Sequence, residues 1–242
     1  MSAHAPAAPL PLPRFRPPGL VASAIIVLRK DLLLEWRTRA RINALVFFGF
    51  CTLLLFSFAL GPDTKLLQKT GAGYLWLALL FSSVLALGET FRIEAENSAM
   101  DGLRLAPADS RAMFLGKAIG TTVVMFGLGW MLVPIMIGLY GVEVKMGAGP
   151  LGLVLLLGAG AVAAPGTVHA AIASHARARD VLLPLLLFPL LVPALLAAVK
   201  ATGLVLEGDP MNQLGSWLAL LAGFNVTFWG AGFLLFPKVV EP

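Results

Sequence analysis

The sequence predicts an all-α integral membrane protein with six transmembrane helices and an interfacial amphipathic helix near the amino terminus. Three observations support this fold class. Hydrophobic residues make up 58% of the 242 residues and charged residues only 13%, well below the roughly 25% that is usual in soluble domains. The hydrophobic residues form long runs, and a run of about 20 can cross a bilayer as one helix. Lys and Arg residues flank these runs, which is typical of membrane proteins.

Residues 1–19 are expected to form a disordered cytosolic tail. Prolines recur throughout this segment, and each one fixes an extended backbone and removes an amide donor. They therefore prevent the continuous apolar helix that a secretory signal peptide needs. These prolines are Pro6, Pro9, Pro11, Pro13, Pro17 and Pro18.

Residues 20–41 have the pattern of an amphipathic helix. Apolar residues recur at helical spacing, and Ser23, Lys30 and Arg37 lie on the opposite side. Basic residues along this segment can meet anionic head groups, so we expect the helix to lie in the plane of the membrane interface. The alternative, a soluble surface helix, would have little protein to pack against. The apolar positions are Val21, Ile25, Leu28, Leu32 and Trp36.

Residues 42–242 are expected to form one domain of six membrane-spanning helices. Each predicted span is a predominantly apolar run long enough to cross the hydrocarbon core. The predicted spans are residues 42–60, 73–91, 119–142, 150–173, 181–199 and 214–237.

The distribution of basic residues predicts that both termini are cytosolic. With the amino terminus inside, fourteen of the 18 Lys and Arg residues fall in cytosolic segments, as the positive-inside rule favours. The net charge of +5 therefore follows from membrane topology. Because the basic residues flank apolar runs rather than form one exposed patch, we expect membrane lipid and no nucleic acid as a partner.

The longest polar stretch lies between the second and third spans, in residues 92–118, and is the expected contact with a cytosolic partner. Charge alone favours a solvated loop, but the apolar residues within the run favour a short helix that binds a partner. Asp109 or Ser110 can cap the helix that follows, by accepting from its free amide groups. The candidate coupling residues are Glu94, Glu96, Met100, Asp101, Leu103, Arg104 and Pro107.

The fifth span contains Pro184, Pro189 and Pro193. Each proline removes a backbone donor and clashes with the preceding turn, so we expect a kinked helix. Broken helices in membranes line cavities or moving interfaces, which makes this span the candidate gating helix. The fourth span is instead rich in Gly and Ala, and small residues allow helices to pack closely.

No catalytic, cofactor-binding or metal site is expected, so the chain is not predicted to be an enzyme. Gly116 and Lys117 resemble the end of a phosphate-binding loop, but Ala118 stands where Ser or Thr is required. His169 and His175 are six residues apart, about 240° around one helix, and cannot share a metal ion. We interpret both as packing or interfacial residues, and keep His169 as an intramembrane functional candidate.

Several stretches of the sequence can be compared with a known family. They are residues 43–48, 56–62, 75–81, 89–107 and 114–117, together with 176–193, which joins a predicted cytosolic turn to the proline-rich fifth span. These stretches resemble the CcmB family, the membrane subunit of the ABC transporter for cytochrome c maturation, also called haem exporter protein B. The resemblance extends over about residues 28–241.

The resemblance implies an ABC-2 type permease fold in the bacterial inner membrane. It further implies a second copy of the chain, a separate CcmA-like ATPase subunit that binds ATP and docks on the coupling helix, and CcmC-like, CcmD-like and CcmE-like partners. The implied function couples ATP hydrolysis to haem export, with haem as cargo, or to release of the haem-loaded chaperone. Two alternatives are an ABC-2 type permease for another cargo, such as a lipid, glycan or drug, and a membrane-embedded enzyme, which would need converging catalytic groups.

Overall fold

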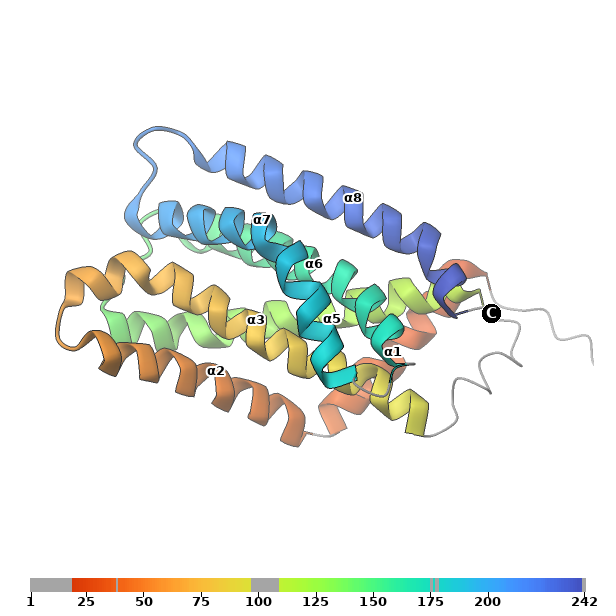
Figure 1. The fold of residues 1–242 in the computed structure, drawn as a ribbon. Coiled ribbons are helices and arrows are strands. Elements are labelled where there is room, and N and C mark those ends of the chain that lie inside the picture. Colours follow the sequence, from red (N-terminus) through yellow and green to blue (C-terminus); the bar gives the residue numbers. More distant parts are fainter. Residues whose placement is uncertain (1–18, 38, 97–108, 175, 177–178, 241–242) are drawn as a thin grey trace, which may run out of the picture.

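The computed structural model describes residues 19–37, 39–96, 109–174, 176 and 179–240. These residues form long helices without strands, and the helices make a bundle with the shorter α1 at one end (Figure 1). The helices are α1 (Leu20–Arg37), α2 (Arg39–Leu60), α3 (Thr64–Glu96), α5 (Ser110–Tyr140), α6 (Ala148–Ser174), α7 (Arg179–Glu207) and α8 (Leu214–Val240).

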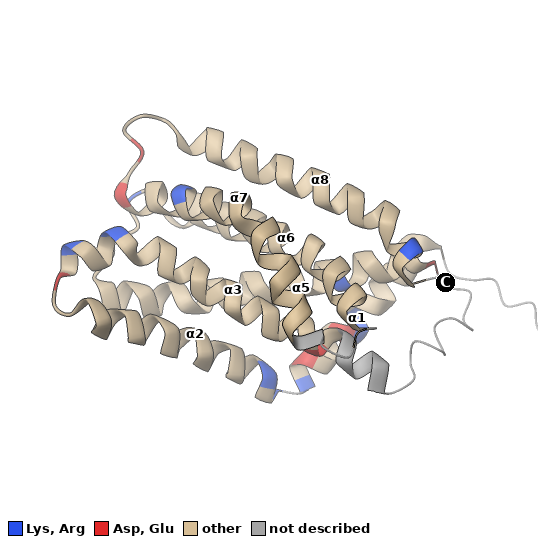
Figure 2. Ribbon diagram, viewed as in Figure 1, with Lys and Arg blue, Asp and Glu red and all other residues tan. Residues whose placement is uncertain are grey.

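Helices α2, α3, α5, α6, α7 and α8 are each long and apolar enough to cross a membrane, which confirms the six predicted spans. Charged residues lie mainly toward the two ends of the bundle, and the ribbons between these ends are almost free of them (Figure 2). This separation is expected of a spanning domain because a charge at the centre of a bilayer is costly. The protein is therefore an all-α integral membrane protein, with α1 as a helix additional to the spans.

All six spanning helices extend beyond the predicted ranges, and three of them do so by two turns or more at one end. Helices α3 and α5 begin nine residues before the predicted positions 73 and 119, and α7 ends eight residues after position 199. These extra turns contain polar residues, so hydropathy alone excluded them. The helices in the structure are therefore longer than the apolar runs that identify them.

Capping residues explain where these extended helices begin or end. The side chain of Asp109 accepts a hydrogen bond from the amide of Arg111 at 2.9 Å, which confirms the predicted cap at the start of α5. Asp63 accepts from an amide in the first turn of α3 in the same way. At the end of α7, Gly208 has a φ of +97° and its amide closes the last turn, a conformation that favours glycine.

Helix α6 is the centre of the bundle and contacts α3, α5, α7 and α8. Its small residues allow this, because a Cβ atom at Gly158 would collide with the indole ring of Trp76 on α3. The indole nitrogen of Trp76 then donates to the hydroxyl of Thr202 on α7 at 2.8 Å. Helices α2 and α8, by contrast, lie at opposite edges of the bundle in Figure 1 and leave most of their residues outside the protein interior.

Helix α7 continues through Pro184, Pro189 and Pro193 as one helix. Figure 1 shows that it is bent, with its amino-terminal part oblique to the remainder. The kink predicted from the three prolines is therefore present, and its role in gating stays a prediction.

Candidate functional site at the α1 end of the bundle

The two ends of the predicted coupling segment lie at the end of the bundle that carries α1. Residues 92–96, which include Glu94 and Glu96, end α3, and residues 110–118 begin α5. The other candidate coupling residues lie outside the described residues, and the role of the set stays a prediction. These residues are Met100, Asp101, Leu103, Arg104 and Pro107.

Helix α1 packs directly on the first turns of α5, and the closest approach is at Gly116. A Cβ atom on Gly116 would lie 2.7 Å from Cβ of Val27 and 2.9 Å from the carbonyl oxygen of Ala24, well inside van der Waals contact. Only glycine therefore allows this spacing. One turn later, a Cβ atom on Gly120 would lie 3.6 Å from the Leu28 side chain. The two helices are therefore in close contact at Gly116, within the predicted coupling segment.

Two ion pairs connect the side of α1 that faces the bundle to neighbouring helices. Oδ2 of Asp31 lies 3.5 Å from Nζ of Lys117 on α5, and the Lys117 side chain is only 1% exposed. Oε2 of Glu35 lies 3.0 Å from Nη1 of Arg41 on α2. Arg41 also donates to the hydroxyl of Thr90 on α3 at 3.1 Å. Charged and polar contacts therefore connect α1, directly or through Arg41, to α2, α3 and α5.

Lys117 is buried beneath α1, a position that its place before the predicted third span does not indicate. The carboxylate of Asp31 partly offsets the cost of removing this charge from water. Helix α1 also has protein to pack against, contrary to the reason given above against a soluble surface helix, because Gly116 and Gly120 of α5 leave room for it.

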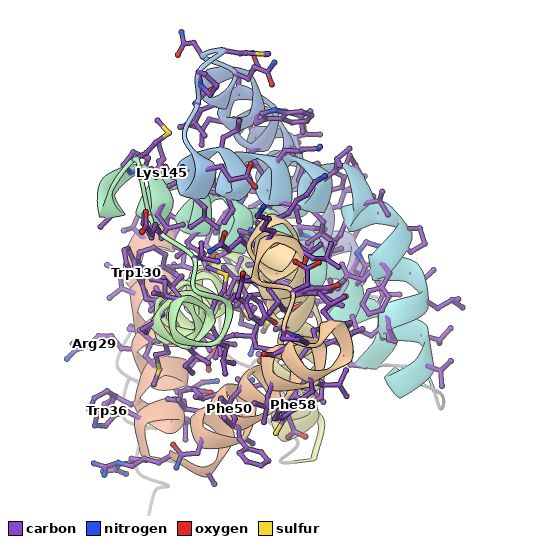
Figure 3. The ribbon with its side chains drawn as sticks, turned by 90° about the vertical axis from the view of Figure 1, so that its left-hand side faces the viewer. Arg29, Trp36, Phe50, Phe58, Trp130 and Lys145 are labelled. Atoms are coloured by element: carbon purple, nitrogen blue, oxygen red, sulfur yellow. The ribbon has the colours of Figure 1, made fainter. Side chains whose placement is uncertain are left out.

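Three of the five predicted apolar positions of α1 are exposed, and the other two, Leu28 and Leu32, are half-buried. Val21, Ile25 and Trp36 are 68%, 49% and 71% exposed. Figure 3 shows Trp36 and Arg29 extending away from the bundle. Asp31 and Glu35 instead lie on the side of α1 that faces the bundle, whereas Lys30 and Arg37 are exposed. The sequence could not identify the partners of these two acidic residues.

Burial raises the pKa of Glu35 above its ordinary value, and the neighbouring Asp31 carboxylate adds to this effect. The Arg41 guanidinium opposes it without cancelling it. Removing a carboxylate from water disfavours its charged form. Glu35 therefore forms an ion pair with Arg41 although its buried surroundings disfavour the charged form of its carboxyl group.

The other polar candidates do not converge on a reaction centre. Nδ1 of His169 lies 2.7 Å from the carbonyl oxygen of Pro165 in the preceding turn of α6, which fits a packing role. His175 lies outside the described residues. Within the part of the chain that the structure describes, no group of three His, Cys, Asp or Glu residues is placed to hold a metal ion.

The fold defines an all-α integral membrane protein with six spans and one additional helix. The family described as CcmB protein matches residues 22–234. The chain therefore belongs to the CcmB family, and the resemblance found from the sequence is confirmed.

Similar proteins carry the name "Heme exporter protein B". The protein from Pseudomonas aeruginosa is 31% identical over 205 residues, which cover 84% of this chain and 91% of that protein. The protein from Haemophilus influenzae is 30% identical over 202 residues, covering 83% of this chain and 89% of that protein. The protein from Rhodobacter capsulatus is 30% identical over 202 residues, covering 82% and 89%. The similarity thus spans nearly the whole membrane domain.

Proposed function

We propose that this chain is the membrane-embedded permease subunit of a haem exporter ABC transporter that serves cytochrome c biogenesis. The observation that carries the proposal is the match of the CcmB family to residues 22–234, which include nearly all of the six spans. Haem is accordingly the candidate cargo, and a permease for a lipid, glycan or drug is not favoured. The work done on haem is either its export or the release of a haem-loaded chaperone.

Energy for this work comes from a separate CcmA-like ATPase subunit that binds ATP and docks on residues 92–118. The ends of this segment support the proposal, because both continue into helices of the bundle, α3 and α5. The start of α5 also holds α1 at Gly116 and Lys117. A force applied to the segment would therefore reach α1 and two spans at once.

The complete machine contains a second copy of this chain and CcmC-like, CcmD-like and CcmE-like proteins. It lies in the bacterial inner membrane with both termini of this chain in the cytosol. The excess of Lys and Arg in the segments assigned to the cytosol supports this orientation. In this arrangement the bent helix α7 is the candidate gate, because its prolines leave backbone carbonyls without helical partners.

Charge reversal in the coupling segment tests the docking of the ATPase. The variant carries Glu94→Lys, Glu96→Lys and Asp101→Lys, and is compared with a control that carries Glu143→Lys and Glu207→Lys. Both control residues are exposed; Glu143 follows the carboxyl-terminal end of α5, and Glu207 is the last residue of α7.

The tagged full-length chain should copurify with ATP-hydrolysing activity from membranes. The triple variant should insert normally but lose this activity, because reversed charge repels the partner surface, whereas the control should retain it. Two results would contradict the proposal: no ATPase with the unaltered chain in any detergent, or full ATPase recovery and normal cytochrome c maturation with the triple variant.

A further inference from the structure

A cavity of about 680 Å³ lies between α1, α2, α3 and α5, where residues 30–35 of α1 line it. Its volume is in the range of small-molecule sites. Charged residues gather in its lining, three basic and three acidic. These residues are Lys30, Asp31, Glu35, Arg41, Glu89 and Lys117.

The lining changes from charged to apolar along each of the three spans. On α2 it passes from Arg41 to Leu45, and on α3 from Glu89 back to Leu85. These steps of four residues each correspond to about 6 Å along a helix. On α5 the lining passes from Lys117 to Val124, a step of about 10 Å. The cavity is therefore amphipathic, with its charged part toward the α1 end and its apolar part deeper between the spans.

The ion pair between Glu35 and Arg41 has unused hydrogen-bonding capacity. Oε1 of Glu35 and Nε of Arg41 are buried and have no hydrogen-bond partner among the described residues. The Glu35 side chain itself is only 9% exposed. Buried polar atoms normally have hydrogen-bond partners. A ligand that carries both a cationic donor and an anionic acceptor would supply partners for Oε1 of Glu35 and Nε of Arg41 together.

We propose that this cavity binds a zwitterionic phospholipid whose headgroup carries a primary ammonium. The ammonium hydrogens would be donated to Glu35 and Glu89, and the phosphate oxygens would accept from Lys30 and Arg41. An acyl chain would occupy the apolar part lined by Leu45, Leu85 and Val124. Small readjustments of the Glu35 and Arg41 side chains would bring their unpartnered atoms to the headgroup.

The lining favours this occupant over haem. Haem carries two propionate groups, and a doubly anionic ligand would face the three carboxylates of the cavity. Among the described residues that line it, none is His, Cys, Met or Tyr, which are the side chains that commonly ligate haem iron. A headgroup with balanced charge instead matches a lining with balanced charge.

Native mass spectrometry of the full-length chain, with defined lipids added, tests the proposal. The added lipids are phosphatidylethanolamine, phosphatidylcholine and phosphatidylglycerol. The unaltered chain should retain phosphatidylethanolamine in preference to the other two, because only its headgroup combines a positive charge with N–H donors for Glu35. Phosphatidylcholine has the charge without N–H groups, and phosphatidylglycerol has hydroxyl donors without the charge. Equal retention of the three lipids would overturn the proposal.

Two variants locate the bound lipid. Glu35→Gln should weaken phosphatidylethanolamine binding roughly tenfold, the loss expected for one hydrogen bond to a charged group, and should remove its preference over phosphatidylcholine. Ala44→Trp fills the cavity without changing any charge, and should abolish retention of the lipid. Arg29→Gln is the matched control, because Arg29 lies beside Lys30 but extends away from the bundle (Figure 3), and its lipid retention should equal that of the unaltered chain.

Lipid retention that is unchanged in both Glu35→Gln and Ala44→Trp would overturn the assignment to this cavity. So would a haem titration in which Ala44→Trp abolishes haem binding while leaving phosphatidylethanolamine retained. Both results are independent of whether an ATPase copurifies, so failure of the lipid site and failure of the proposed function are distinguishable.

Discussion

The contact between α1 and α5 at Gly116 can be tested by adding one methyl group. In Gly116→Ala the new Cβ atom would lie 2.7 Å from Cβ of Val27 and 2.9 Å from the carbonyl oxygen of Ala24. Carbon atoms in contact prefer about 3.5–4.0 Å, so α1 must move by roughly 1 Å. The nearer obstacles are a Cβ atom and a backbone oxygen, and neither can be relieved by rotating a flexible side chain. Overpacking of this kind costs about 1–3 kcal/mol.

Gly120→Ala provides a matched control on the same face of α5. Its Cβ atom would lie 3.6 Å from Cδ1 of Leu28, which is ordinary contact, so the variant should behave like the unaltered chain. Thermal unfolding of the purified chain should show a lower Tm for Gly116→Ala alone. ATP hydrolysis by the assembled transporter should also be poorly coupled to cytochrome c maturation in Gly116→Ala. Identical behaviour of the two variants would refute the claim that α1 is seated on α5 at Gly116.

Three further predictions concern the buried charges and the bent helix. Asp31→Asn should destabilise the protein by about 1–3 kcal/mol because the ammonium group of the buried Lys117 loses a charged partner. The double variant with Lys117→Met should recover part of this loss, and strictly additive effects in thermal unfolding would contradict a direct pair. Because burial raises the pKa of Glu35, the native state favours its protonated form, and this contribution to stability is lost as pH rises through the raised pKa. The Tm of the unaltered chain should therefore fall relative to that of Glu35→Gln as pH rises above the ordinary value of 4.5, and parallel curves would disprove it. Replacing the prolines of α7 with alanine should impair activity more than membrane insertion, since it straightens the helix, and wild-type activity at normal protein levels would remove them from the mechanism. These prolines are Pro184, Pro189 and Pro193.

The number and order of the spans could be predicted because hydrocarbon thickness sets a minimum length for an apolar run. The ends of the spans could not, because they depend on caps rather than on hydropathy. Asp109 was recognisable as a cap from its position, and the structure confirms it. Asp63 carries the same signal at the start of α3, but the apolar run begins too far beyond it for hydropathy to connect the two.

The charged contacts beneath α1 show a different limit. Asp31 and Glu35 are four residues apart and therefore share one face of the helix, which the sequence alone could have indicated. Their partners could not be found in this way, because Lys117 lies 86 positions from Asp31. Lys117 also reads as an ordinary flanking residue of an apolar span. Only the packing of α1 on α5 turns it into a buried cation.

Deletion of the gene from its host, followed by measurement of covalently bound c-type haem, tests the central claim most directly. We expect that c-type cytochromes are lost and that a plasmid copy of the unaltered chain restores them. Accumulation of the haem-loaded chaperone in the deletion strain would indicate failed release, and its absence would indicate failed haem supply. Normal levels of c-type cytochromes in the deletion strain would contradict the assignment of this permease to haem export.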